Sequence, residues 1–106
     1  QLVFILQRGV RFPQGPPIMI YFVYLILSKN KNQKYISYVG YTKNLSKRLN
    51  LHNQSKGAKF TRGRQWRMIY FEKYDTKSNA LKAEYKLKKN YLLRKKLKEK
   101  FLNEKK

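Results

Sequence analysis

The sequence predicts a small mixed α/β domain of the α+β type, in which helices flank a three-stranded, mostly antiparallel sheet. The chain has 106 residues, of which 42% are apolar and 15% aromatic, and this is enough for one modest core. Segments with strand and helix patterns follow in the order strand, strand, helix, strand, helix, helix. Cysteine is absent, so such a fold cannot depend on disulfides.

The first 18 residues differ in character from the rest. An apolar hexamer is followed by a stretch with two glycines and three prolines, which precludes a regular element. Regular patterning starts near Met19. We therefore expect one domain over residues 19–106, with residues 1–18 either a non-native start or a short extension that is flexible or packs on an edge strand.

Three segments are typical of strands. Residues 20–27 are almost continuously apolar and rich in aromatic and branched side chains, which predicts a central strand buried on both faces. A polar turn over residues 28–34 connects it to a second strand, residues 35–41, in a hairpin. This second strand carries Gly40, where the backbone can approach a ligand closely. Residues 66–74 alternate in part and predict the third strand.

Three segments are typical of helices. Thr42 or Asn44 can cap a helix that runs to about Asn53, with Leu45 and Leu49 facing inward. Thr76 or Ser78 can cap a second helix that is read over residues 80–91. A final amphipathic helix over residues 91–102 places its apolar residues on one side and lysines on the other; these apolar residues are Leu93, Leu97 and Phe101.

The charge of the chain indicates a polyanionic partner. There are 26 Lys and Arg residues against 5 Asp and Glu, a net charge of +21, and such self-repulsion is otherwise only a cost to the folded state. Nucleic acid is the first candidate and an anionic membrane surface the second. No apolar run approaches the length of a membrane span. We expect a cytoplasmic protein associated with the bacterial nucleoid.

Glu84 is unusual because it is a carboxylate on an apolar helix stripe. In the helix over residues 80–91, Ala80, Leu87 and Tyr91 share one face, and Glu84 fills the remaining position on it. A buried anion must be paired, hydrogen-bonded or bound to a metal. Two interpretations follow: a salt bridge to one of the many lysines, or a metal ligand that faces a phosphate.

Five motifs in order resemble the GIY-YIG nuclease superfamily over residues 20–90, and most closely its small stand-alone bacterial members. They are Val23-Tyr24, Tyr38-Val39-Gly40, Arg48, His52 one turn later, and Glu84. The first motif reads Phe22-Val23-Tyr24 in place of Gly-Ile-Tyr. Tyr24 and Tyr38 are 14 residues apart, so we expect a longer hairpin turn. The alternative Tyr35-Ile36-Ser37 lacks the glycine.

The resemblance implies hydrolysis of a DNA phosphodiester with one divalent metal, Mg²⁺ or alternatively Mn²⁺, held by Glu84, water and the phosphate. Arg48 would fork onto the phosphate. Tyr38 would be the general base, and Tyr24 would hold the nucleophile or the phosphate. His52 would orient Tyr38 or contact the phosphate, unless it is a polar residue of the helix surface. The alternative for both tyrosines is packing in the core or at the surface.

Cations and loop residues near these motifs are expected to contact DNA. The loop over residues 54–65 is basic and has no acidic residue, and phosphate contacts of this kind provide affinity without sequence information. Phe60 and Trp66 either stack on unpaired bases or pack over the third strand. The expected DNA contacts are Gly40, Tyr41, Lys43, Lys56, Lys59, Arg62 and Arg64.

The sequence therefore predicts a metal-dependent DNA endonuclease that is selective for branched, flapped or single-stranded structure rather than for sequence. A non-catalytic nucleic-acid-binding module is the first alternative. A basic peripheral protein that binds anionic surfaces through its last helix is the second. The sequence leaves open the choice between DNA and RNA, the need for a partner protein, and the oligomeric state.

Overall fold

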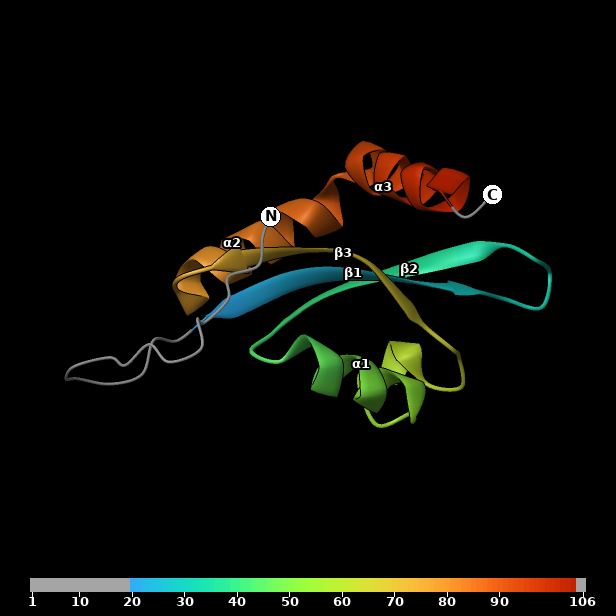
Figure 1. The fold of residues 1–106 in the computed structure, drawn as a ribbon, viewed down its shortest axis with the longest axis horizontal. Coiled ribbons are helices and arrows are strands. Elements are labelled where there is room, and N and C mark those ends of the chain that lie inside the picture. The colour runs from blue at the N-terminus through green and yellow to red at the C-terminus, as the bar shows by residue number, and fades with distance from the viewer. Residues whose placement is uncertain (1–19, 105–106) are drawn as a thin grey trace.

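A three-stranded sheet with helices on both faces forms the fold (Figure 1). The computed structural model describes residues 20–104, and the predicted extension over residues 1–18 lies outside the described residues. The strands are β1 (Tyr21–Lys29), β2 (Tyr35–Thr42) and β3 (Arg67–Tyr74). The sheet has the order β2-β1-β3, and both strand pairs are antiparallel. The predicted α+β class is confirmed.

The helices lie on opposite sides of this sheet. They are α1 (Leu45–Asn53), the short 3₁₀ helix η1 (Lys59–Thr61), α2 (Lys77–Lys89) and α3 (Tyr91–Glu104). Helices α2 and α3 lie on one side of the sheet, and α1 lies on the other (Figure 1). Within residues 20–104, no helix is long and apolar enough to cross a membrane.

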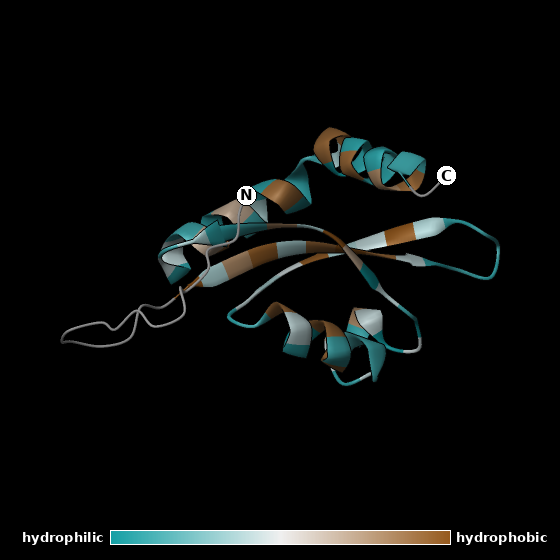
Figure 2. Ribbon diagram, in the orientation of Figure 1, coloured by the Kyte–Doolittle hydropathy of each residue, from teal (hydrophilic) through white to brown (hydrophobic). Residues whose placement is uncertain are grey.

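The central strand β1 is buried on both faces, as its apolar sequence predicts. Val23 and Leu25 pack with Ala80 and Leu87 of α2, whereas Tyr24 and Ile26 belong to the cluster on the α1 side. Successive side chains of a strand point to opposite faces, so one apolar run supplies two cores. Figure 2 shows the hydrophobic residues along this strand in the middle layer.

The β1–β2 turn is longer than a tight two-residue hairpin, as expected from the spacing of the two tyrosine motifs. The amide of Asn30 donates to the carbonyl of Lys34 at 2.8 Å, and the amide of Gln33 donates back to the carbonyl of Asn30. The resulting register places Tyr24 opposite Gly40 and Ile26 opposite Tyr38. The two motif tyrosines therefore lie on the same face of the sheet, two positions apart on neighbouring strands.

Side-chain caps decide where α1 and α2 begin. Asn44 Oδ1 accepts from the amide of Lys47 at 3.0 Å, and Thr76 Oγ1 accepts from the amide of Asn79 at 3.1 Å. Each bond satisfies a backbone amide that has no partner within the helix. Asn44 and Thr76 are therefore the caps among the two pairs of candidates.

The predicted helix over residues 80–91 is wrong at its end. Helix α2 ends at Lys89, and Asn90 caps the start of α3 by accepting from the amide of Leu93 at 3.0 Å. Ala80 and Leu87 are buried as expected, but the Tyr91 side chain is 63% exposed. The chain changes direction at Asn90, so Tyr91 does not continue the face of α2. In α3, Leu97 packs against the core while no residue of the helix is fully buried.

Candidate active site

A buried hydrogen bond between Tyr24 and His52 lies at the centre of the α1 side of the sheet. The hydroxyl of Tyr24 and Nε2 of His52 are 2.7 Å apart, and the two residues are 1% and 0% exposed. The interpretation of His52 as a polar residue of the helix surface is therefore wrong. Its complete burial also argues against a direct contact with a phosphate, because no part of the ring reaches the surface.

The hydrogen bonds around His52 define the direction of proton donation. Nδ1 of His52 lies 2.8 Å from the hydroxyl of Thr61, and this hydroxyl donates to the carbonyl of Ala58 at 2.8 Å. A threonine hydroxyl has only one proton, so it must accept from Nδ1–H. Nε2 is then unprotonated and accepts the proton of Tyr24. The chain of donation runs from Tyr24 through His52 and Thr61 to a backbone carbonyl.

Burial keeps both partners neutral at pH 7. It lowers the pKa of His52 to about 4, with the positive charge of Arg48 acting in the same direction. It raises the pKa of Tyr24 to about 12, although a hydrogen bond from Arg48 and its charge act in the opposite direction. A neutral phenol and a neutral imidazole are the pair that the donation chain requires.

Two glycines make room for this pair. A Cβ atom at Gly40 would lie 2.5 Å from the hydroxyl oxygen of Tyr24, and a Cβ atom at Gly57 would lie 2.5 Å from Nδ1 of His52. Both distances are too short for any side chain. We expected Gly40 to let a ligand approach, but the ring of Tyr24 occupies that space, and Gly40 itself is buried.

Tyr38 lies over His52, within a cluster of aromatic rings. Its ring is edge-on to His52, with centroids 5.2 Å apart, and stacks on Phe60 with centroids 6.1 Å apart and an interplanar angle of 20°. Trp66 is 3% exposed and its indole N–H donates to the carbonyl of Thr61 at 2.9 Å, which confirms the packing interpretation for Trp66. Phe60 is 55% exposed, so it packs on Tyr38 and still presents a surface to solvent.

Arg48 and Glu84 complete the group around Tyr24. The guanidinium of Arg48 lowers the pKa of Tyr24, whereas the charges of Tyr38 and Glu84 raise it. Contacts join Tyr24, Tyr38 and His52, whereas Arg48 on α1 and Glu84 on α2 act on Tyr24 through their charges.

Glu84 forms the salt bridge that one interpretation of its sequence position predicted. Its Oε2 lies 3.5 Å from Nζ of Lys88, and the two side chains are 17% and 52% exposed. A pair this open to water and four residues apart on a helix contributes only about 0.3–0.5 kcal/mol. Within residues 20–104, no three His, Cys, Asp or Glu side chains gather into a metal-binding group.

The expected DNA contacts divide by location. Lys43, Lys56, Lys59 and Arg62 are exposed and Arg64 is half-buried, so these cations can reach a polyanion. Tyr41 instead packs against the core on the α2 side, on the face of β2 opposite to Tyr38.

Thr61 and Gly57 were missed by sequence reasoning. Only their position in the glycine-containing loop shortly after the single histidine could have indicated them.

Comparison with known proteins identifies the class of this domain. The sequence pattern of the GIY-YIG catalytic domain matches residues 20–98. The chain therefore belongs to the GIY-YIG family, a nuclease-type family.

Within this family, the chain is similar to small bacterial UPF0213 proteins. It is 40% identical to one from Bacillus velezensis over 86 residues, 80% of each chain. It is 48% identical to one from Bacillus licheniformis over 69 residues, which is 64% of this chain and 68% of the relative. A solution NMR structure of the UPF0213 protein BH0048 from Bacillus halodurans matches with 34% identity and a TM-score of 0.40, covering 74% of this chain and 80% of the other.

Proposed function

We propose that this protein is a metal-dependent endonuclease that hydrolyses phosphodiester bonds of DNA. The observation that carries the proposal is that Tyr24 and Tyr38 both contact the buried ring of His52, while the charges of Arg48 and Glu84 act on Tyr24. A guanidinium, a phenol and a carboxylate are the groups that phosphate binding, proton transfer and metal binding need. The net charge of +21 supports a polyanionic substrate.

Each side chain has a role that its surroundings support. Arg48 binds the phosphate and stabilises the charge that develops on it in the transition state. Tyr38 takes the proton of the attacking water. The hydroxyl of Tyr24 donates a hydrogen bond to His52 and accepts one from Arg48, so it positions the guanidinium instead of holding the nucleophile itself.

Glu84 fits a divalent metal by the chemistry of its carboxylate, and Mg²⁺ is the first choice, with Mn²⁺ as the alternative. Mg²⁺ takes oxygen ligands and retains several waters, so a single protein carboxylate suffices when a phosphate oxygen also binds. When bound, such a metal neutralises charge on the phosphate and lowers the pKa of a water.

The exposed face of Phe60 supports selectivity for unpaired DNA. This ring lies beside Tyr38 and keeps 55% of its surface open, and stacking of a base on an aromatic ring is worth about 1–3 kcal/mol without regard to sequence. We therefore place single-stranded, flapped or branched DNA ahead of perfect duplex. The expected site of action is the bacterial nucleoid in the cytoplasm.

A cleavage assay with the full chain tests this proposal. Labelled duplex, flap, fork and single-stranded DNA are incubated with Mg²⁺, Mn²⁺ or chelator. We expect metal-dependent cleavage that falls about 10²–10³-fold in Glu84→Gln while DNA binding persists. Glu99→Gln, which removes an exposed carboxylate from α3, is the matched control and should cleave normally.

Other outcomes would contradict the proposal in different ways. Unchanged cleavage by Glu84→Gln would show that Glu84 is not the metal ligand. Binding of every substrate without cleavage of any would support the alternative function, a non-catalytic nucleic-acid-binding module. The same result in the presence of cell extract would exclude a missing partner protein as the reason.

A further inference from the structure

A concave basic surface lies at the C-terminal end of β1, beyond Tyr24 of the candidate active site. It is a groove of about 530 Å³ between the β1–β2 turn and the segment that precedes β3. We call it the basic groove. Its lining residues come from two short stretches of chain and are Lys29, Asn30, Lys31, Asn32, Arg62, Gly63, Arg64 and Gln65.

The charges of the basic groove are unbalanced. Four of its lining residues are cationic, and within the described part of the chain no acidic side chain lines it. The first acidic residue anywhere in the sequence is Glu72, so the two stretches that form the groove have no acidic neighbour in sequence. Concentrating like charges in a concavity destabilises the fold unless an anion binds there.

Both walls of the groove are held in place by hydrogen bonds. Oδ1 of Asn30 accepts from the amides of Asn32 and Lys34, each at 2.9 Å. On the other wall, the amide of Gly63 donates to Ser55 Oγ at 2.9 Å. Little chain entropy is therefore lost when a ligand binds between the walls.

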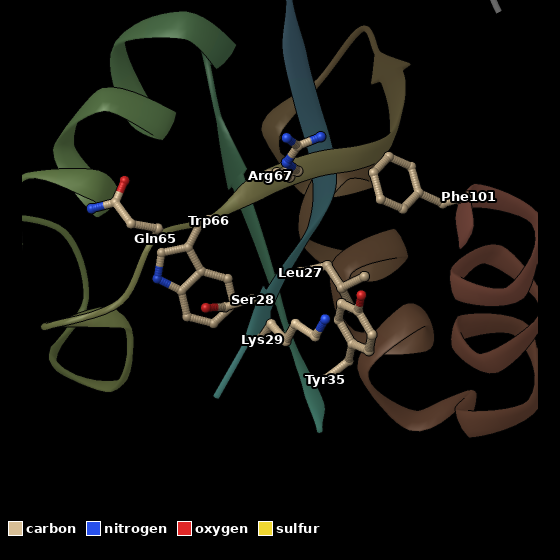
Figure 3. Close-up of a pocket in the computed structure, with 8 residues that line it drawn as sticks. All are labelled: Leu27, Ser28, Lys29, Tyr35, Gln65, Trp66, Arg67 and Phe101. Carbon is tan, nitrogen blue, oxygen red and sulfur yellow. The ribbon is translucent and has the colours of Figure 1, made fainter. Parts of the chain in front are cut away.

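The end of this second wall is also anchored. The amide of Trp66 donates to Asn53 Oδ1 at 2.6 Å, and Asn53 Nδ2 donates to the carbonyl of Trp66 at 3.2 Å. Figure 3 shows the neighbouring cavity, which shares Lys29 and Gln65 with the groove and has Trp66 on one side and Phe101 on the other. The segment that forms this wall is therefore held in place by hydrogen bonds at both of its ends.

The distance along β1 relates the groove to the site of chemistry. Five residues separate Tyr24 from Lys29, and at about 3.3 Å per residue the strand advances about 17 Å between them. This separation corresponds to a few nucleotides of a nucleic-acid strand.

We propose that the basic groove binds the phosphodiester backbone of the substrate strand a few nucleotides from the bond that is cleaved. This inference rests on the proposed nuclease function for the position of the cut, but not for the binding itself. Lysine and arginine side chains supply the charge, and the amide groups of Asn32 and Gln65 suit phosphate and sugar oxygens. Contacts of this type fix the register of a nucleic-acid strand without reading its sequence.

Binding measurements in chelator test the groove independently of catalysis. The double variant Lys31→Gln/Arg64→Gln of the full chain is titrated against a labelled 20-base-pair duplex over a range of salt concentrations. Each lost phosphate contact lowers the slope of log affinity against log salt by about 0.9. We expect a slope smaller by about 1.8 and an affinity about 30-fold weaker at 0.15 M salt.

Three controls separate a loss of phosphate contacts in the groove from other causes of weaker binding. Lys82→Gln/Lys86→Gln removes the same charge from exposed positions of α2 and should leave the slope unchanged. Lys31→Arg/Arg64→Lys keeps the charge of the groove and should keep the slope. The unfolding midpoint of each variant in urea, followed by tryptophan fluorescence, confirms that the fold is retained.

Several results would overturn the proposal. Equal losses in the groove and α2 variants would mean that the net charge alone matters. An unchanged slope in the groove variant would exclude phosphate contacts there. Loss of binding to anionic phosphatidylglycerol vesicles with DNA binding intact would assign the groove to a membrane surface. If cleavage occurs, substrates that end within one or two nucleotides of the cut cannot reach the groove, so the groove variant and the natural sequence should cleave them equally well.

Discussion

The single histidine of this chain makes one prediction unusually direct. His52 is fully buried and hydrogen-bonded at both ring nitrogens, and its pKa falls from 6.5 to about 4 on folding. Between these values the unfolded chain binds a proton that the folded protein does not. The free energy of unfolding therefore decreases as the pH falls from 6.5 towards 4.

The size of this effect follows from the two pKa values. A shift of about 2.5 units corresponds to about 3 kcal/mol over the whole range, at 1.36 kcal/mol per unit. About 2 kcal/mol of this should be lost between pH 7 and pH 5. The lower limit of pH 5 is chosen because Asp and Glu in model peptides have pKa values of about 3.9 and 4.3.

Urea unfolding followed by Trp66 fluorescence measures the change, because the single tryptophan is buried. An NMR titration of the imidazole C–H signals should give a midpoint near 4, and nitrogen shifts at pH 7 should report the Nδ1–H tautomer. The His52→Gln variant should lose the pH dependence between 5 and 7. A midpoint near 6.5, or equal stability at pH 5 and pH 7, would refute the description of His52 as a buried, neutral acceptor.

Three further predictions concern the surroundings of this histidine and of the helix carboxylate. Gly40→Ala forces a Cβ against the Tyr24 hydroxyl and should cost about 2–4 kcal/mol in urea unfolding, whereas Gly63→Ala has open space and should cost only the 1–2 kcal/mol of its left-handed backbone. Thr61→Val leaves the histidine Nδ1–H without an acceptor, so we expect a loss of about 1–3 kcal/mol and a change of tautomer by NMR, while Thr61→Ser preserves both. Lys88→Gln should change stability by less than about 0.5 kcal/mol, and a larger loss would mean that the salt bridge is the main role of Glu84.

The architecture was predictable because its signals are local. The continuous apolar run of β1 requires burial on both faces, and alternation, caps and a polar turn mark the remaining elements. The end of α2 was missed, since Tyr91 fits the apolar spacing of the preceding helix as well as it fits the start of the next one. Only the cap at Asn90 decides between these alternatives, and its geometry depends on how α3 packs against the sheet.

The candidate site residues could be proposed from motifs, whereas the partners of these residues could not. Spacing along the chain identified Tyr24, Tyr38, Arg48, His52 and Glu84 as a group. It did not show that His52 bonds to Tyr24 rather than to Tyr38, or that Thr61 sets its tautomer. These contacts join residues 28 and 9 positions apart, so they arise only when α1 and its following loop dock on the sheet.

By itself, the sequence determined the class of fold, the excess of positive charge and the motifs of the GIY-YIG family. Composition and the spacing of apolar residues can be read directly from the sequence, and they decide which segments are buried and which stay in contact with water. Only the tertiary structure decided which tyrosine is buried and protonated, that Gly40 accommodates a ring instead of a ligand, and that two distant stretches of cations form one groove. Desolvation, steric fit and charge proximity depend on neighbours in space, and the order of residues along the chain does not specify them.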